Sequence, residues 1–389
     1  MKHHKREQPR PTHALGFVST RRQLLLAGAV APVAFALGVR PSRAAALRSP
    51  AESKDNAALR SLLGDEGIRI LTYASLAPSG HNTQPWTVYV VDRANWRIGT
   101  RRDHWLPAVD PSNRETLLSI GAFLENLIVA AGNLGYAVEY EVLARTSFDS
   151  PLIDLRLHKA QPGEYPLARL ERRRTLRKGF GNQLLRAEDV RAVTGGASEF
   201  SYFPRDGKAA QFLSEATIEA NRVQTYRDPA QEELADWIRW SKQDQVRLRN
   251  GLTPAGMEID GILGWYVGTF YDRADVLTPG FREAGIKQAV ERVSQGAGWI
   301  VMTGPDSVAG LIETGRRFQR MWLLLREHSI AIHPMSQMLE ESSDTKAVAR
   351  ELGIDGVPQF VLRVGYVTKY PDPVSPRMPV TWFTQKGES

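Results

Sequence analysis

Two side-chain amides stand two residues apart in a turn-forming stretch, residues 77–86 (Ala-Pro-Ser-Gly-His-Asn-Thr-Gln-Pro-Trp). Asn82 and Gln84 each carry a hydrogen-bond donor and an acceptor, and Ser79 adds a hydroxyl group. Such a set suits the edge of a flat heterocycle that alternates C=O and N–H groups. The same residue types are also common in surface turns. The stretch therefore predicts either a ligand-binding loop or an ordinary turn.

A second group of residues is basic and compact, at residues 172–177 (Arg-Arg-Arg-Thr-Leu-Arg). Planar guanidinium groups bind phosphate through paired N–H donors, and a threonine hydroxyl adds another donor. Near the C-terminus, Arg377 lies in a Ser-Pro-Arg-Met-Pro stretch. Each arginine alone could be a solvated surface charge. Several of them converging on one place would form an anion site.

The first 46 residues are typical of an export signal. Arg21 and Arg22 precede a mild apolar run over residues 24–39, and a small-residue stretch follows at 42–46. This run is shorter than the roughly 20 residues that a membrane span needs. We expect a twin-arginine signal peptide over 1–46 that engages the twin-arginine export machinery, and a periplasmic or secreted protein. The alternative is a membrane anchor.

The leader also accounts for the net charge of the chain, which is formally +7 with 50 basic and 43 acidic residues. Residues 1–44 hold eight Lys or Arg and one Glu, which leaves 42 basic and 42 acidic residues. A balanced mature chain gives no basis for nucleic-acid binding. The chain has no cysteine, which excludes disulfides and thiolate metal sites. We therefore expect no metal, no nucleic acid and no stable membrane span in the mature protein.

The elements that must position these groups occur in a similar order twice along the chain. The apolar patterns predict helices over 57–76, 114–134 (capped by 110–113), from near 186, and over 308–328, with strands at 87–91, 96–100, 137–143, 152–158, 298–303 and 359–366. A Pro/Gly-containing connector at 161–166 separates the two runs. We expect an α+β chain with a degenerate duplication, a first half over 57–160 and a second over 170–383.

The loop and the basic turn together carry a resemblance. Pro78-Ser79-x-x-Asn82-x-Gln84-Pro85-Trp86 is similar to the flavin-binding loop of the FMN-dependent nitroreductase family, and residues 173–177 resemble its Arg-Arg-Ser-x-Arg signature. In ordinary family members the two motifs come in the opposite order, and FMN lies at a dimer interface. The order here resembles the Acg-like two-domain branch. It implies a nitroreductase-like α+β fold of two fused repeats, a pseudo-dimer, with one flavin site.

The resemblance also implies which residues bind the flavin. FMN would be bound by Pro78, Ser79, Asn82 and Gln84 at the ring edge, Arg173, Arg174, Thr175, Arg177 and Arg377 at the phosphate, and Ser336 and Gln337 near N5. Family members often have Glu-Gly where this chain has Ser336 and Gln337. Hydride transfer from a nicotinamide needs no protein acid or base at that step, so no catalytic residue is assigned.

Residues 252–271 mix four glycines with Met, Trp, Tyr and Phe, and predict either a mobile lid or an aromatic helix packed on the core. The leading hypothesis is an exported FMN-binding oxidoreductase that passes hydride from NADPH or NADH to FMN and on to nitro or quinone acceptors. A non-enzymatic protein that sequesters or stores FMN under a closed lid is the alternative. A flavin-free descendant used for protein interaction is the third hypothesis.

Overall fold

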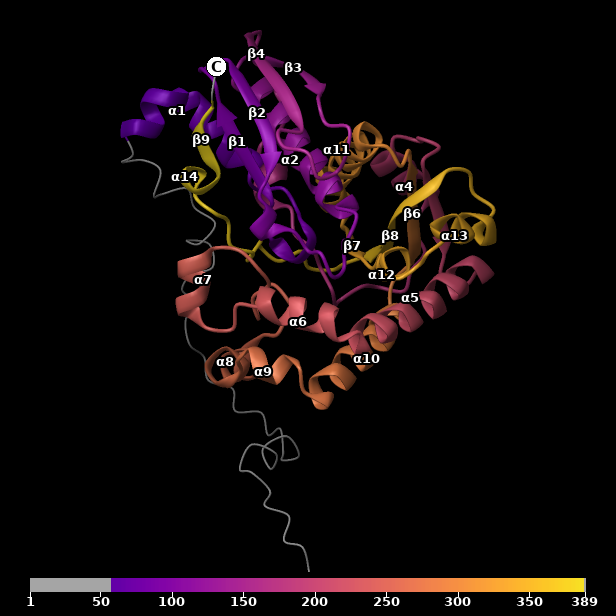
Figure 1. Ribbon diagram of the computed structural model, residues 1–389. Coiled ribbons are helices and arrows are strands. Elements are labelled where there is room, and N and C mark those ends of the chain that lie inside the picture. The colour runs from indigo at the N-terminus through magenta and orange to yellow at the C-terminus, as the bar shows by residue number, and fades with distance from the viewer. Residues whose placement is uncertain (1–56, 388–389) are drawn as a thin grey trace, which may run out of the picture. The chain divides into compact units, whose positions relative to one another are not determined.

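Two β-sheets and two long helices organise residues 57–387, the part of the chain that the computed structural model describes (Figure 1). These residues belong to one unit, Ser42–Ser389. The predicted signal peptide, residues 1–46, lies outside the described residues.

The first sheet has five strands in the order β3-β4-β2-β1-β9. They are β1 (Trp86–Val90), β2 (Asn95–Thr100), β3 (Tyr136–Val142), β4 (Ile153–Lys159) and β9 (Thr384–Lys386). In β4 buried Ile and Leu residues alternate with exposed polar ones, because one face of the sheet covers the core and the other faces water. β9 pairs in parallel with β1. The C-terminal end of the described chain therefore completes the sheet that the N-terminal strands began.

Two helices pack with this sheet, α1 (Ala57–Ala74) and α2 (Arg114–Asn133). By length and composition α2 could cross a membrane, but 78% of its apolar stretch is buried inside the protein, as expected for a core helix. The carboxylate of Asp110 accepts the backbone N–H groups of Glu115 and Thr116 at 3.1 and 2.9 Å. Asp110 thus accepts hydrogen bonds from backbone N–H groups in the first turn of α2, which have no partner inside the helix. The side chain of Asn113, the residue before the helix, makes no such hydrogen bond.

The second sheet has four antiparallel strands in the order β5-β6-β8-β7. They are β5 (Phe200–Pro204), β6 (Gly298–Gly304), β7 (Ile330–Pro334) and β8 (Val357–Tyr366). Strand β6 is apolar along most of its length because both of its faces are covered. Its residues Ile300 and Met302 contact a cluster from α11 (Val308–Leu325), while Trp299 and Val301 contact α5 (Lys208–Tyr226).

Most of the remaining helices lie between β5 and β6 in sequence. Together with α5 these are α6 (Asp228–Trp237), α7 (Lys242–Leu248), α8 (Gly261–Phe270), α9 (Arg273–Val276) and α10 (Pro279–Val293). The others are α3 (Ala168–Arg172), α4 (Ala187–Thr194), α12 (Gln337–Glu340), α13 (Thr345–Leu352) and α14 (Val380–Phe383). Figure 1 shows α6 to α10 below the two sheets.

Helices α2 and α11 pack along each other and join the two sheets, and Leu311 and Ile312 of α11 belong to the first hydrophobic core. The predicted α+β class with a repeated architecture is confirmed by these two sheets and their paired helices. The predicted helices at α1, α2, α4 and α11 and the predicted strands at β1, β2, β3, β4, β6 and β8 are present. Strands β5, β7 and β9 and the helices α5, α6, α7, α9 and α10 were not predicted. Helix α8 lies within residues 252–271, where an aromatic helix was one of the two alternatives. Met378, Val380 and Phe383, assigned to the second half, pack in the core of the first.

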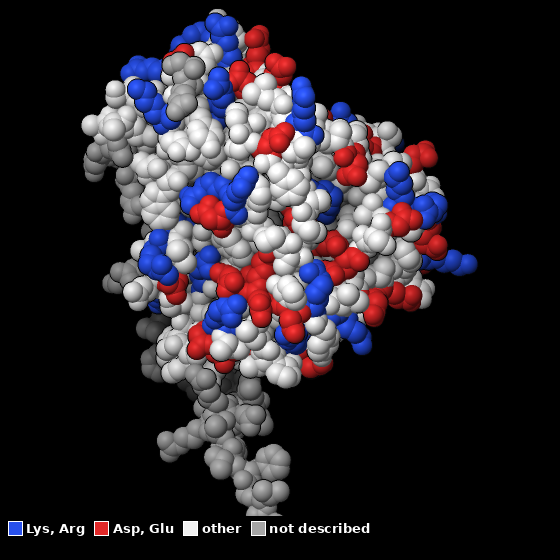
Figure 2. Space-filling view, in the orientation of Figure 1, with Lys and Arg blue, Asp and Glu red and all other residues white. Residues whose placement is uncertain are grey.

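Charged side chains of both signs are spread over the face shown in Figure 2, and acidic groups in its lower middle have Lys and Arg beside them. This mixture agrees with the balanced charge expected for the mature chain.

Candidate functional site

The loop at residues 77–86 has an unusual backbone. Its centre is a short 3-10 turn at Gly80–Asn82, and His81, Asn82 and Gln84 have φ angles of 47°, 54° and 56°. Left-handed backbone at three non-glycine residues is uncommon and requires surrounding contacts to hold it. One such contact is local, because the Ser79 hydroxyl accepts the backbone N–H of Gln84 at 2.9 Å.

The two amides hold the loop to distant parts of the chain. Gln84 donates to Arg249 O at 2.9 Å and accepts from Met378 N at 2.9 Å. Asn82 donates to Gly251 O and Pro376 O at 3.1 and 3.2 Å. Both amides are buried, and buried polar groups need such partners. The structure thus uses these amides to position the loop, and their contact with a flavin edge stays a prediction.

Arg377 and Arg173 also bind this loop region. Arg377 donates to Asn82 Oδ1 at 2.8 Å and to Ala77 O at 3.1 Å. Both arginines donate to one carbonyl oxygen, that of Leu76, Arg173 at 3.1 Å and Arg377 at 3.3 Å. Arg173 also stacks over the ring of Trp322, 4.5 Å from its centre. Two of the predicted phosphate ligands, distant in sequence, are therefore neighbours.

A small cavity of about 90 Å³ gathers the predicted phosphate ligands. Its lining includes Arg173, Arg174, Thr175, Arg177, Ser375 and Arg377, and no carboxylate of the described residues lines it. Burial lowers the pKa of Arg173 to about 10 and that of Arg177 to about 10, so their charged forms carry a desolvation cost. A bound anion would offset that cost.

Glu258 provides a carboxylate just outside the lining of this cavity. It is 8% exposed, and one of its oxygens accepts the backbone N–H groups of Arg177 and Lys178, both at 2.9 Å. The other oxygen lies 3.5 Å from a nitrogen of Arg174. Glu258 therefore offsets part of the positive charge in this region.

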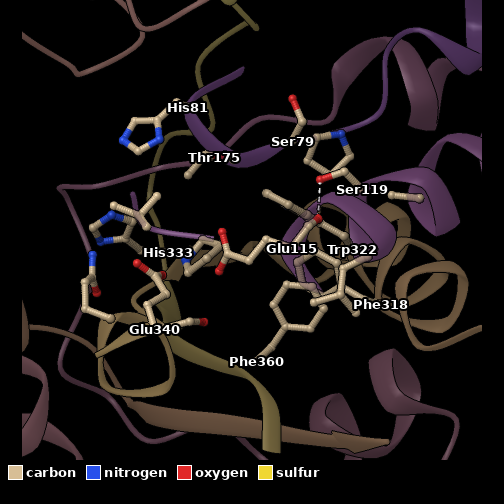
Figure 3. A pocket seen from close by; sticks show the side chains of 18 of the residues that line it. Ser79, His81, Glu115, Ser119, Thr175, Phe318, Trp322, His333, Glu340 and Phe360 are labelled. Carbon is tan, nitrogen blue, oxygen red and sulfur yellow. Dashed lines mark hydrogen bonds between the residues drawn. The ribbon is translucent and has the colours of Figure 1, made fainter. Parts of the chain in front are cut away.

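A larger cavity of about 300 Å³ lies beside the small one (Figure 3). Pro78, Ser79, His81, Thr175, Arg177 and Leu252 line both cavities. Phe318, Trp322 and Phe360 form an apolar wall in the larger one, and Ser336 and Gln337 line it too. A ligand with an anionic end and a flat apolar end would fit the pair of cavities. The volume of the larger cavity is at the lower end of the range for small-molecule sites, which is about 300–1,000 Å³.

Four buried polar atoms of the larger cavity have no hydrogen-bond partner among the described residues. They are His81 Nδ1, Trp322 Nε1, His333 Nδ1 and Gln337 Oε1. Burial lowers the pKa of His81 to about 4 and that of His333 well below its usual range, and nearby arginines, Arg177 among them, lower both further. Both rings are therefore neutral near pH 7. Unpartnered buried polar atoms are costly, so a ligand that bonds to them would be stabilised.

The structure brings together ten of the eleven predicted site residues in the two cavities. The exception is Gln84, which lines neither. Sequence reasoning missed the aromatic wall, whose Phe318 and Trp322 were indistinguishable from core residues at a four-residue helical spacing. It also missed Glu115 and Glu340, which line the larger cavity from α2 and α12.

The segment predicted as a lid divides into two parts. Leu252 lines both cavities, and Thr253 and Gly256 line the small one. Helix α8 lines neither of the two cavities, and Ile262 and Trp265 on it are 85% and 62% exposed. Lid movement stays a prediction, and the structure limits the cavity-lining part to the residues before α8.

Comparison with known proteins supports the resemblance. No protein-family model matches the chain. A Mycobacterium tuberculosis protein, provisionally named an NAD(P)H nitroreductase, is 26% identical over 343 residues, 84% of this chain and 92% of its own. A Serratia protein, provisionally named the NAD(P)H nitroreductase PigM, is 24% identical over 76% of this chain and 86% of its own. The solved Mycobacterium smegmatis FMN-dependent nitroreductase NfnB, in complex with NADPH, is 17% identical over 56% of this chain and 95% of its own, with a TM-score of 0.29, too low to establish a shared fold.

Proposed function

We propose that this chain is an FMN-binding oxidoreductase of the nitroreductase family, which takes hydride from NADH or NADPH and reduces small nitro or quinone acceptors. The observation that carries the proposal is the arginine-lined cavity beside the aromatic cavity. Within residues 57–387 no carboxylate lines the arginine-lined cavity. The names of the sequence relatives support the same activity.

The residues of this chain fit FMN at both ends. Arg173, Arg174, Arg177 and Arg377 with Thr175 would hold the phosphate, because guanidinium groups match a dianion in charge and geometry. The unpartnered oxygen of Gln337 would accept an N–H group of the ring system. Bound FMN would supply the hydride-accepting and hydride-donating centre. The protein would orient it and exclude water with Phe318, Trp322 and Phe360.

A comparison of FMN with riboflavin tests the phosphate site, because riboflavin lacks the phosphate and keeps the rings. Charge-assisted hydrogen bonds contribute about 1.5–3 kcal/mol each, so FMN should bind at least about tenfold more tightly. The Arg177→Gln and Arg377→Gln variants should lose most of this preference in a fluorescence titration. Arg247→Gln, an exposed arginine paired with Asp244, should keep it. Equal affinity for the two flavins in the wild-type protein would remove the proposed phosphate site.

A second candidate function, FMN sequestration without turnover, is favoured by the segment that precedes α8. Asn82 O accepts the backbone N–H of Gly251 at 3.0 Å, and Asn82 and Gln84 hold the carbonyls of Gly251 and Arg249. These bonds fix the segment against the flavin-binding loop. If they persist when flavin is bound, access to the ring is restricted. Reduction by a nicotinamide separates the two functions, and failure to bind any flavin would favour an interaction protein.

We also propose that the protein is exported to the periplasm or secreted through the twin-arginine machinery, on the basis of Arg21, Arg22 and the apolar run after them. Replacing both arginines by lysine should retain the protein inside the cell in a fractionation experiment. Unchanged export of this variant would contradict the proposal.

A further inference from the structure

The larger cavity contains two carboxyl groups, one from each half of the chain, to which the proposed function gives no role. Glu115 is in the first turn of α2 and Glu340 ends α12. In Figure 3 their carboxyl groups lie next to each other, between the two histidines and the aromatic wall. A Cβ atom added at Gly80 would lie 3.4 Å from Glu115 Oε2, so this carboxyl also reaches the loop at residues 77–86.

The charges around this pair do not balance two carboxylates. Arg114 is paired with Glu115 at 3.2 Å, and Gln224 donates to Glu340 at 2.6 Å without adding charge. The neighbouring cation Arg227 is paired with Glu341 at 2.5 Å. Among the described residues, Glu340 therefore has no ion-pair partner, and two like charges at close range disfavour double ionisation. Burial first, and then the charge of Glu115, raise the pKa of Glu340 well above its usual range.

An independent feature of the same cavity points to a ligand beside this pair. His333 is 8% exposed, lines the cavity, and its Nδ1 has no partner among the described residues. With its pKa lowered by burial and by Arg177, Arg363 and Arg292, it is neutral and does not balance the second carboxylate. His81 is likewise neutral. Neither histidine therefore holds the surplus proton, which leaves the carboxyl groups. Burial, and then the charge of Glu115, also raise the pKa of the nearby Asp110 to about 7, but Asp110 lines neither cavity, so within the larger cavity the proton lies on Glu115 and Glu340.

We propose that Glu115 and Glu340 share one proton and deliver it to the acceptor as the acceptor is reduced. The proposal rests on the proposed function and adds a proton donor to it. Reduction of a quinone to a hydroquinone takes two electrons and two protons, equivalent to one hydride and one proton. The hydride equivalent originates on the nicotinamide. The carboxyl O–H bond breaks, an O–H bond forms at a quinone oxygen, and the pair is left as two carboxylates.

The pair must then recover a proton before the next turnover. The Glu115 side chain is 21% exposed, so water can return the proton to this member of the pair. Glu340, whose pKa is raised well above its usual range, acts as the donor. Positioned general acids typically accelerate a step by roughly 100- to 10,000-fold.

Two acceptors separate proton delivery from electron transfer. The FMN-loaded protein is reduced with dithionite and mixed anaerobically with benzoquinone, which takes up protons, or with ferricyanide, which takes up only an electron. Glu340→Gln should slow benzoquinone reduction by about 100-fold and leave ferricyanide reduction unchanged. The matched control is Glu219→Gln, an exposed carboxylate outside the cavity lining, which should slow neither. Equal rates in wild type and Glu340→Gln, or slowing of both acceptors, would overturn the proposal.

A second readout uses the flavin-free protein. A protonated carboxylic acid has its own infrared C=O stretch. This band should persist near pH 7, disappear in Glu340→Gln and in Glu115→Gln, and remain in the exposed-site control Glu219→Gln. Absence of a band that depends on Glu115 and Glu340 would overturn the shared proton whether or not flavin binds. If the band is present but the protein does not bind FMN, the proposed function and proton delivery would both be wrong, while the shared proton would stand. If Glu340→Gln does not fold, the same results are expected of Glu115→Gln in both experiments, and the same outcomes would overturn the proposal.

Discussion

Gly121 of α2 and Gly315 of α11 face each other where the two helices cross. A Cβ atom added at Gly121 would lie 2.9 Å from the Cα of Gly315 and 2.0 Å from Ile312 O. A Cβ atom added at Gly315 would lie 2.1 Å from Leu118 O. Each glycine therefore meets the carbonyl three residues before the other glycine. This reciprocal contact is the relationship expected of a pseudo-two-fold axis between two repeats.

Replacing Gly121 by alanine should destabilise the protein, because the added methyl group collides with backbone rather than with a movable side chain. Overpacking of this kind costs about 1–3 kcal/mol. The matched control is Gly132→Ala in the same helix, where an added Cβ meets nothing within 4 Å. Alanine there should be neutral or stabilising, by up to about 1 kcal/mol. Urea denaturation measures both, and equal stabilities would contradict the close crossing.

The sequence predicted the parts of the site that are marked by local motifs. Arg173, Arg174, Thr175 and Arg177 lie within five residues of one another in sequence, and their chemistry predicts an anion site. Arg377 is predicted separately, and the structure brings it to the same cavity. These predictions needed no knowledge of packing, because several guanidinium groups and a hydroxyl group lie close together in the sequence itself.

The parts that sequence could not predict depend on which distant segments meet. No local pattern links Glu115 with Glu340, since their proximity comes from α2 meeting α12. Gln84 was predicted as a ligand because a side-chain amide suits a flavin edge. In the fold, its amide nitrogen and its amide oxygen both hydrogen-bond to backbone groups, which the sequence does not show. Met378 and Phe383 follow β8 in sequence yet pack in the other core, which only the tertiary structure determines.

Acid should destabilise the flavin-free protein partly through His81. Burial lowers its pKa from 6.5 to about 4, so the unfolded chain binds a proton more readily between these values. The contribution is fully present above pH 6.5 and is lost as the pH falls toward 4. Between about pH 7 and about pH 4.5 the wild type should lose about 2 kcal/mol more than His81→Asn.

Asparagine suits the positive φ of residue 81, so this variant isolates the titration from backbone strain. His158→Asn, at a partly exposed site on β4, serves as a control and should show the same acid loss as the wild type. Equal acid losses in His81→Asn and the wild type would show that His81 is not buried as described.

Glu258→Gln should lower the free energy of unfolding of the flavin-free protein by about 3–5 kcal/mol, because it removes a buried charge that offsets those of Arg174 and Arg177. FMN should then raise the melting temperature of the variant by more than that of the wild type, since the phosphate replaces the lost charge. Asp260→Asn, an exposed carboxylate paired with Lys178, should change neither value. A smaller FMN effect in Glu258→Gln would contradict the charge argument.

Hydrogen exchange should locate the part of residues 252–271 that responds to flavin. The backbone amides at 252–258 adjoin the cavities, so FMN should slow their exchange. Helix α8 lines neither cavity and should exchange at an unchanged rate. Strong protection of α8 by FMN would show that this helix closes over the ligand and would support the full-length lid.

In the proposed function, the paired cavities bind FMN in a form that a nicotinamide can reduce. The most direct measurement is the absorption spectrum of the FMN-loaded protein during anaerobic addition of NADPH and then NADH, with dithionite as the control reductant. Rapid bleaching of the flavin band by either nicotinamide is the predicted result. A band that persists with both nicotinamides and is bleached by dithionite would contradict the oxidoreductase and favour FMN sequestration.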